Sequence, residues 1–286
     1  MIAQLIQSNN MIKNIFVPTD FSDCAGYAVD AAIKFAERFG SAIYLYHCVD
    51  LPQNWDKLSA EKYASVLAEM QTISNAEIFL DEIKVKHPNI DISRIISGGN
   101  LYENMVKYIE EYSIDLIIMG SHGTSGKNEF FIGSHTQKAV RMIKHCPVLI
   151  VKDKIKKLDF KKVVYASGFN ENERETFLKF KKMMLPFLPE IHLLAVHTSH
   201  FFDAPYILQH EAMDYYIKLA EPLVCKKHIL RDFSVDTGTR SFAKAIDADL
   251  IGISNHYRHP LKRMLVGSNV EALVNHSAIP VMTIDY

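Results

Sequence analysis

The chain lacks the features that mark membrane, secreted and nucleic-acid-binding proteins. No apolar run approaches the roughly 18 residues that cross a bilayer, so no transmembrane helix is expected. Residues 1–10 lack the basic stretch and apolar core of a secretory signal, so we expect none there. The net charge is −1, and no basic patch is interleaved with aromatic residues. The composition thus gives no support for a nucleic-acid or membrane partner.

Cysteine is scarce as well. Cys24, Cys48, Cys146 and Cys225 form no CxxC pair, and their spacing fits neither a zinc nor a disulfide framework. We therefore expect four small, unpaired thiols in the reducing environment of the cytoplasm.

What the chain does have is an internal repeat, within a length that suffices for two domains. The tripeptide Asp-Leu-Ile at 115–117 recurs at 249–251. The pair Gly-Ser at 133–134 recurs at 267–268 with the same offset of 134 residues. The second part of the chain is therefore a divergent copy of the first.

The two copies differ in length. Their opening segments, 14–21 and 162–169, match with an offset of 148 residues, so the second copy is 14 residues shorter in its middle. A charged link at 152–157 separates the copies, which predicts domains at 1–153 and 158–286.

Each copy has the pattern of alternating strands and helices. In the first copy, apolar segments predict strands at 14–18, 42–48, 92–96, 115–119 and 147–151. Amphipathic segments predict a helix between the N-cap Ser22 and the C-cap Gly40, and further helices at 59–85, 100–112 and 136–143. Such alternation implies parallel pairing with right-handed crossovers. The predicted class is α/β, with two tandem doubly wound five-stranded parallel sheets, whose ligands bind at the carboxyl ends of the strands.

A glycine-bearing loop follows the fourth predicted strand. Gly120 and Gly123 come after the apolar run 116–119, and Gly133 precedes the helical pattern. Glycine permits positive φ and close approach of backbone N–H groups, and a helix start offers free amides, so the segment predicts a phosphate site. We expect Ser134 to cap the helix and to contact a phosphate. The spacing matches neither a P-loop nor a GxGxxG dinucleotide turn.

Two further segments end at the same predicted edge. Asp20 follows the first strand, where a carboxylate could accept hydrogen bonds from ribose hydroxyls or help to hold a metal, although Asp is also common in turns. Cys48 lies at the end of the second strand, where backbone groups could face a purine base or the strand could simply end.

Taken together, these segments resemble the universal stress protein family. The resemblance rests on Val-Pro-Thr-Asp-Phe-Ser at 17–22, Met-Gly-Ser-His-Gly at 119–123, Gly-Ser at 133–134 and the Pro-Val strand at 147–151. It covers nearly the whole chain as two family units. It implies an adenine nucleotide alpha hydrolase-like fold, ATP binding and a role in a stress response or its regulation.

The resemblance also implies residue roles. Asp20 would lie near the ribose, and Cys48, where the family usually has a small aliphatic residue, beside the adenine. The glycines would hold the phosphates of ATP, ADP or AMP, with or without Mg²⁺. The candidate nucleotide-binding residues are Pro18, Thr19, Asp20, Cys48, Met119, Gly120, His122, Gly123, Gly133, Ser134 and His135.

The second copy departs from this motif. Gly168 stands in place of Asp20, and Tyr257 in place of Gly123. A side chain at 257 would fill space that a phosphate-binding backbone leaves open, so we expect no family-type ATP binding there. We expect a structural role instead, in which the last strands of the two copies pair as an internal pseudo-dimer.

Other functions remain as alternatives. No nucleophile with a neighbouring base marks a catalytic centre, so we expect ATP hydrolysis to be slow at most. The main alternative is a docking module that binds a protein partner, which the sequence does not name, and no nucleotide. Metal binding is less favoured, because the histidine pairs His197 with His200 and His256 with His259 have no cysteine or carboxylate joined to them. Flavin-based redox transfer is the least favoured, and dimerisation of the whole chain stays open.

Overall fold

The structure of the chain is a computed structural model. The described residues are 12–49, 51, 67–121, 133–144, 146–198, 206–254 and 269–285, with only the backbone described for residues 67–72 and 134. None of the helices in these ranges is long and apolar enough to cross a membrane. Cys24, Cys48, Cys146 and Cys225 are free thiols, as predicted.

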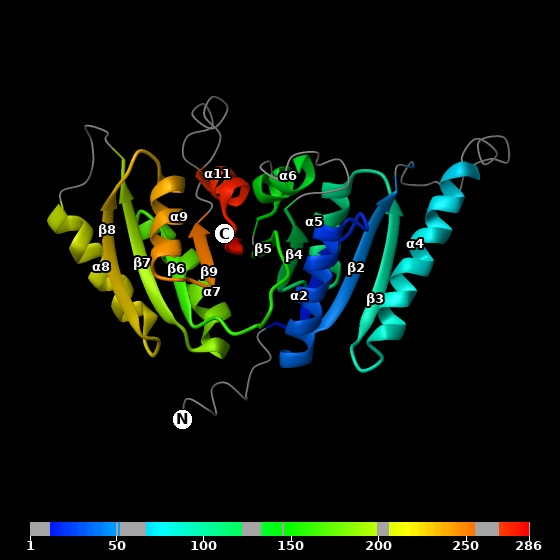
Figure 1. Cartoon of the computed structure of the whole chain (residues 1–286), viewed down its shortest axis with the longest axis horizontal. Helices are drawn as coiled ribbons and strands as arrows, with labels where there is room; N and C mark the ends of the chain where they lie inside the picture. The colour runs from blue at the N-terminus through cyan, green and yellow to red at the C-terminus, as the bar shows by residue number, and fades with distance from the viewer. Residues whose placement is uncertain are drawn as a thin grey trace.

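Within the described residues, one ten-stranded sheet runs along the molecule in the order β3-β2-β1-β4-β5-β10-β9-β6-β7-β8 (Figure 1). The strands are β1 Asn14–Pro18, β2 Ala42–Val49, β3 Ile92–Gly98, β4 Leu116–Gly120, β5 Val148–Val151, β6 Lys162–Ala166, β7 Glu190–His197, β8 Cys225–Arg231, β9 Leu250–Ser254 and β10 Val281–Ile284. We call the part that contributes β1 to β5 the first half and the part that contributes β6 to β10 the second half. Neighbouring strands within each half are parallel, which confirms the predicted fold class.

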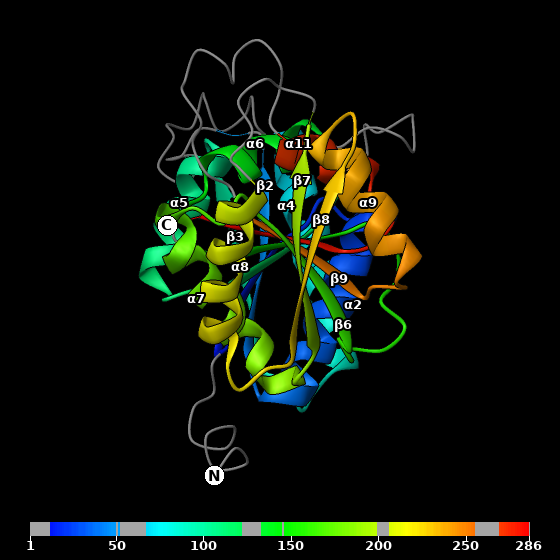
Figure 2. The same cartoon turned by 90° about the vertical axis from the view of Figure 1, so that its left-hand side faces the viewer.

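Helices cover both faces of the sheet. The helices are α2 Asp23–Phe39, α4 Leu67–Lys86, α5 Leu101–Glu111, α6 Ser134–Met142, α7 Arg174–Met184, α8 Tyr206–Ala220, α9 Val235–Ala245 and α11 Asn269–His276, with short 3₁₀ turns η2 Glu171–Glu173 and η3 Leu185–Phe187. One apolar core packs beneath α2, α4, α7 and α8, and a second beneath α5, α6, α9 and α11. Figure 2 shows this layering at the second half, where β7 and β8 lie between α8 and α9. Both cores contain residues from both halves, so burial is continuous along the sheet.

The capping signals of the first helix are confirmed. The side chain of Ser22 accepts a hydrogen bond from the backbone N–H of Ala25, and Gly40 adopts a left-handed conformation at the C-cap with φ 68°. Because a residue with a side chain pays a steric penalty at positive φ, glycine suits this stop. The cap places the start of α2 directly after β1, at the carboxyl edge of the sheet.

The two halves meet where β5 and β10 pair antiparallel, with Leu149 opposite Met282. This pairing confirms the predicted contact between the last strands of the two copies. The link between the halves is also tied to α2: Lys34 Nζ donates to the carbonyl oxygen of Ile155 at 2.6 Å, and Arg38 Nη1 to that of Leu158 at 2.7 Å. The antiparallel junction therefore turns two five-stranded sheets into one.

The halves fill the same place in the core in different ways. By the repeat offsets, Gly252 on β9 corresponds to Ile118, and Phe180 on α7 corresponds to Ala32. The Phe180 ring lies within 3 Å of where a Cβ on Gly252 would stand. The first half has a large residue on the strand and a small one on the helix. The second half has a small residue on the strand and a large one on the helix, so the total side-chain volume between strand and helix is conserved.

Candidate functional site

The segment after β1 is held tightly at the carboxyl edge. The backbone N–H of Thr19, which is buried, donates to the carbonyl oxygen of Tyr46 on β2 at 2.8 Å. Asp20 Oδ1 accepts hydrogen bonds from the backbone N–H of Ser22 at 3.2 Å and from its hydroxyl at 2.6 Å. Asp20 therefore acts as a turn residue, which is one of the two roles predicted for it. The hydrogen bonds hold its half-buried carboxylate at the start of α2, where the helix dipole favours negative charge.

An aromatic stack supports this turn, and no sequence pattern predicted it. Phe21 has a φ of 64°, which costs a residue with a side chain about 1–2 kcal/mol. Its ring lies 4.6 Å from that of His47 and 5.3 Å from that of Phe79 on α4, measured between centroids. His47 Nδ1 lies 2.9 Å from the carbonyl oxygen of Thr19, and because a carbonyl only accepts, Nδ1 carries the proton. The stack thus offsets the strain of the turn that carries Asp20.

The ends of β2 and β3 are joined by a polar network that was also missed. Asn104 of α5 is buried, and its Nδ2 lies 3.1 Å from the hydroxyl of Tyr46, 3.0 Å from that of Ser97 and 2.9 Å from the carbonyl oxygen of Gly98. Burial raises the pKa of Tyr46 well above its usual value. Cys48 is half-buried beside this network, so the strand end where a base is expected has a fixed shape.

Glycine was predicted at 120 because it permits both a positive φ and a close backbone approach. Gly120 does not use a positive φ, since the positive-φ glycines among the described residues are Gly40 and Gly99. A Cβ on Gly120 would stand 2.7 Å from the carbonyl oxygen of Cys24 and 3.0 Å from the backbone nitrogen of Ala25. Glycine therefore lets the last residue of β4 approach the backbone of α2.

The second half lacks this glycine, and its first helix starts differently. Ser254 occupies the position of Gly120, and the 3₁₀ turn η2 replaces the first turn of the helix. By the repeat offset, Glu171 corresponds to Asp23, yet α7 begins only at Arg174. The two helices thus start differently, α2 directly as an α-helix and α7 after a 3₁₀ turn.

The helix after the glycine loop begins without a side-chain cap. Gly133 is the N-cap, and Ser134 is the first helical residue, so the prediction that Ser134 caps the helix was wrong. The N–H of Gly133 donates to the carbonyl oxygen of Ser121 at 2.7 Å, and Thr136 Oγ1 donates to that of Gly120 at 2.7 Å. Because the first backbone N–H groups of a helix have no partner within it, those of residues 134–136 point out of the start of α6, where an anion can accept from them.

The start of α6 also favours negative charge. Its first turn contains no acidic residue. His135 Nδ1 lies 3.0 Å from the hydroxyl of Tyr102, whose pKa burial raises to about 12. Lys138 Nζ lies 4.3 Å from the centre of the Tyr102 ring, a cation that sequence reasoning did not single out. An anion at the helix start would thus meet backbone amides, and the imidazole of His135 and the ammonium group of Lys138 lie around Tyr102 on the same helix turn or the next.

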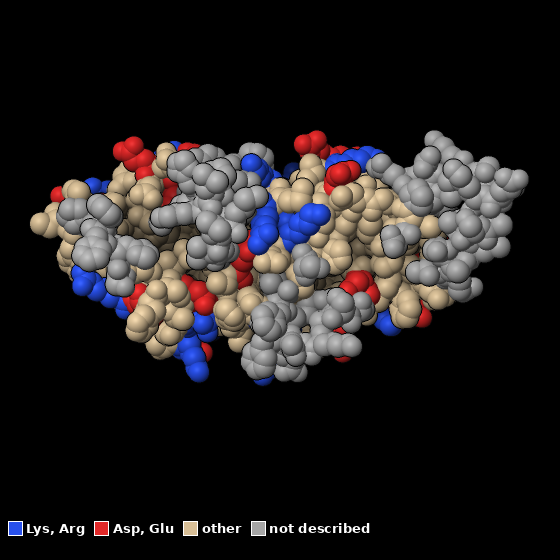
Figure 3. Space-filling model, turned by 90° about the horizontal axis from the view of Figure 1, so that it is seen from above, with Lys and Arg blue, Asp and Glu red and all other residues tan. Residues whose placement is uncertain are grey.

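Most of the predicted site residues lie together. Strand β1 pairs with both β2 and β4, so the carboxyl ends of these three strands are adjacent. The described candidates at this edge are Pro18, Thr19, Asp20, Cys48, Met119, Gly120, Gly133 and His135. His122 and Gly123 lie outside the described residues, as does the side chain of Ser134. Viewed onto this edge, described basic and acidic residues are interspersed, in keeping with the near-zero net charge (Figure 3).

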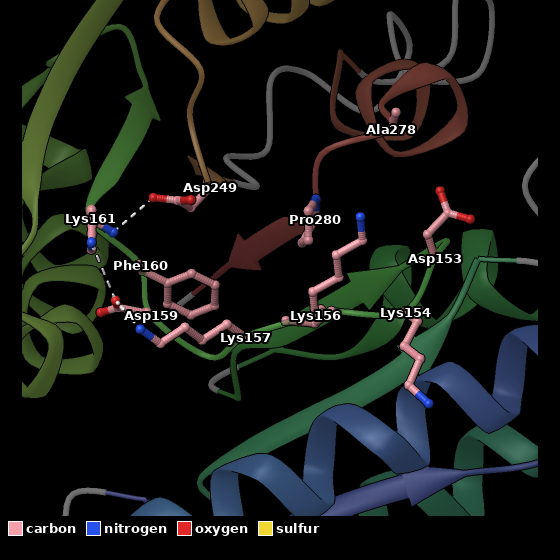
Figure 4. A pocket seen from close by; sticks show the side chains of 11 residues that line it. Asp153, Lys154, Lys156, Lys157, Asp159, Phe160, Lys161, Asp249, Ala278 and Pro280 are labelled. Carbon is pink, nitrogen blue, oxygen red and sulfur yellow. Dashed lines mark hydrogen bonds and ion pairs between the residues drawn. The ribbon is translucent and has the colours of Figure 1, made fainter.

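The link between the halves lines a second hollow of the molecule. A cavity of about 440 Å³ lies away from this edge, between the link and the start of β10 (Figure 4). Asp159 is 3.4 Å from Lys157 Nζ and 3.7 Å from that of Lys161, so these charges are satisfied along its wall. The described residues contain no cluster of three or more potential metal ligands, while several histidines of the predicted pairs lie outside them.

A comparison of the sequence with models of known protein families identifies one family. The model of the universal stress protein family matches residues 11–152 and 197–285. The chain belongs to the universal stress protein family. Both copies of the repeat are thus units of one family.

Individual members agree with this assignment. Two universal stress proteins of Methanocaldococcus jannaschii are each 29% identical to this chain, over 144 and 159 residues, or half of it, and over 84% and 97% of their own lengths. The crystal structure of a universal stress protein from Archaeoglobus fulgidus superposes with a TM-score of 0.72 at 20% identity, covering 97% of this chain and 98% of that one. A protein of unknown function from Pseudomonas aeruginosa gives 0.64 at 15% identity over 99% and 94%. The two-unit fold thus recurs in other proteins.

The second half differs from the first at the position of Asp20. Gly168 stands there, and its carbonyl oxygen accepts a hydrogen bond from Gln209 Nε2 on α8 at 3.2 Å. The nearby carboxylate belongs to Glu173, which is buried, and accepts from the hydroxyl of Ser167 at 2.8 Å and the backbone N–H of Asn170 at 3.1 Å. This carboxylate serves the start of the helix. Residue 168 itself therefore supplies no carboxylate where the first half has Asp20, and Tyr257 lies outside the described residues.

Proposed function

We propose that the first half binds an adenine nucleotide, ATP, ADP or AMP, at the carboxyl edge of β1, β2 and β4. The observation that carries the proposal is the start of α6, which lacks a side-chain cap and lies on the same edge as the fixed carboxylate of Asp20. A helix start without a cap suits a phosphate, and a carboxylate suits ribose hydroxyls. Family membership supports the same assignment.

The proposed roles follow the resemblance to the universal stress protein family. Pro18, Thr19, Asp20 and Cys48 would contact the nucleoside. The residues that would contact the phosphates are Met119, Gly120, His122, Gly123, Gly133, Ser134 and His135. Mg²⁺ bound with the nucleotide would take most of its ligands from phosphate oxygens and water, with Asp20 as an available carboxylate.

We assign binding to a unit at 1–153 and a structural role to a unit at 158–286. The hydrogen bond from Gln209 to Gly168 and the absence of a carboxylate at residue 168 support this division. The protein would act in a stress response or its regulation by the nucleotide it holds, with at most slow ATP hydrolysis. Its free thiols suit the cytoplasm.

The test is equilibrium binding of ATP and AMP by the wild type and by Gly123→Val. We expect micromolar-range binding by the wild type and none by the variant, because a branched side chain would block the approach of the backbone to phosphate. Gly26→Ala is the matched control, since a Cβ there meets nothing within 4 Å. Equal binding by wild type and Gly123→Val, or none by wild type, would refute the proposal.

The alternative is a docking module that binds a protein partner and no nucleotide. Mass spectrometry of ligands released when the purified protein is denatured would separate the two functions. A released adenine nucleotide favours the proposed function. A ligand-free preparation that also fails to bind added ATP favours docking.

A further inference from the structure

The phosphate-binding helix proposed above is attached to the second half of the molecule. Helix α6 and helix α11 lie side by side above the junction of β5 and β10 (Figure 1). Glu271 of α11 accepts hydrogen bonds from Gln137 Nε2 at 3.0 Å and from Arg141 Nη2 at 2.6 Å, while its other oxygen accepts from Arg141 Nε. Two residues of α6 thus donate hydrogen bonds to one carboxylate of the second half.

In this contact the carboxylate is buried and the guanidinium group is partly exposed. The side chain of Glu271 is 6% exposed and that of Arg141 is 45% exposed. Hydrogen bonding to Glu271 raises the pKa of Arg141 above its usual value. A buried carboxylate that receives a two-point contact from a guanidinium group has a fixed geometry, unlike a surface ion pair.

The same contact cannot form between two copies of the first unit. By the offset of 134 residues, Gln137 corresponds to Glu271, and Arg141 corresponds to Asn275. Two first units would place Gln137 opposite a second Gln137, with no carboxylate for Arg141. The fused chain has diverged at this position so that one half supplies the carboxylate and the other supplies both donors.

The contact lies close to the proposed phosphates. Gln137 is the fourth residue of α6, one turn from Ser134, and Thr136 between them is bonded to the carbonyl oxygen of Gly120. A shift of α6 at Gln137 would therefore move the amides of its first turn relative to β4. Those amides are useful to a phosphate only while they converge on one point.

We propose that Glu271 of the second half is a positioning residue for the nucleotide site of the first half, because it fixes the helix whose start receives the phosphates. The inference rests on the proposed function. It gives the second half a specific task in binding even though that half has Gly168 at the position of Asp20.

When Glu271 is replaced, the change in charge and the release of α6 have opposite effects on the affinity for a nucleotide. Removing a negative charge and leaving Arg141 unpaired would strengthen the attraction of phosphates. Releasing α6 would weaken it. Adenosine has no phosphates, so its affinity reports only on the nucleoside part of the site and should respond to neither change.

The experiment measures the dissociation constants of ATP and adenosine by calorimetry for wild type, Glu271→Leu and Glu271→Gln. We expect Glu271→Leu to weaken ATP binding about fivefold or more while adenosine binding changes less than about twofold. Glu271→Gln, which retains one acceptor, should give an intermediate loss. If Glu271→Leu does not fold, Glu271→Gln carries the same test through the ratio of the two affinities.

A control variant breaks the junction elsewhere. Arg38→Gln removes the hydrogen bonds from Arg38 to the carbonyl oxygens of Leu158 and Pro186 without touching α6. It should lower stability and leave the ratio of ATP to adenosine affinity unchanged. An unchanged ratio in the Glu271 variants, or tighter ATP binding, overturns the positioning role and leaves the proposed function intact. A wild type that binds no ATP overturns both.

Discussion

Replacement of Gly120 by alanine is the sharpest test of how the candidate site is built. The new Cβ would stand 2.7 Å from the carbonyl oxygen of Cys24, which is 0.7 Å short of the 3.4 Å at which ordinary contact begins. Its neighbours are backbone atoms at the start of α2, so no side chain can rotate away. Either α2 or the end of β4 must move.

The expected cost follows from the packing around this glycine. Overpacking of a close-packed interior destabilises a protein by about 1–3 kcal/mol, and we expect Gly120→Ala to fall in that range. Because the start of α2 carries Ser22 and the hydrogen bonds to Asp20, nucleotide affinity should fall together with stability. Urea-induced unfolding followed by circular dichroism measures the first effect, and calorimetry the second.

The control is Gly26→Ala, in the interior of α2 with open space around the new Cβ. Alanine favours a helix over glycine by about 1 kcal/mol, so this variant should be as stable as wild type or more stable. A Gly120→Ala protein that unfolds at the same urea concentration as wild type would contradict the argument from close approach.

Two further predictions concern the second half. Gly252→Ala should lower the free energy of unfolding by about 1–3 kcal/mol, because the Phe180 ring occupies the space of the new Cβ, and Gly252→Ala with Phe180→Leu should recover most of the loss in urea denaturation. A Gly252→Ala variant as stable as wild type would contradict the close packing of the Phe180 ring against Gly252. Burial lowers the pKa of His192 and of His228 below 6.5, and the two imidazoles lie 3.0 Å apart from Nδ1 to Nε2. The unfolded chain then binds protons more readily than the folded one, so stability should be full above pH 6.5 and should fall as the pH drops below it. His228→Gln should flatten this dependence in thermal unfolding between pH 5 and 7.5, and an unchanged slope would contradict the assignment.

Parts of the site were predictable because their signals are local. Ser22 and Gly40 cap α2 through atoms within four residues of each cap. Asp20 and Gly133 follow directly from their places beside a strand and a helix. The carboxyl edge was predictable in the same way, since parallel strands of one sheet end together.

Other parts were not predictable because they depend on residues far apart in the chain. The close contact of Gly120 is with Cys24, and the stack on Phe21 includes Phe79 of another helix. The cap of α6 was misassigned by one residue, from Gly133 to Ser134, because both are acceptable at an N-cap. The ion pair between Arg141 and Glu271 joins residues that are 130 positions apart in the chain.

The repeat, the alternation of strands and helices and the family motifs follow from the sequence by itself, because periodicity, caps and turns are set by residues a few positions apart. They determine two doubly wound units and the edge at which a ligand would bind. Tertiary structure alone decided that β5 and β10 pair antiparallel with Leu149 opposite Met282, that Gly120 serves the approach of α2, and that a carboxylate of the second half holds a helix of the first. Those features arise from close packing and hydrogen bonds between distant segments, which no local pattern records.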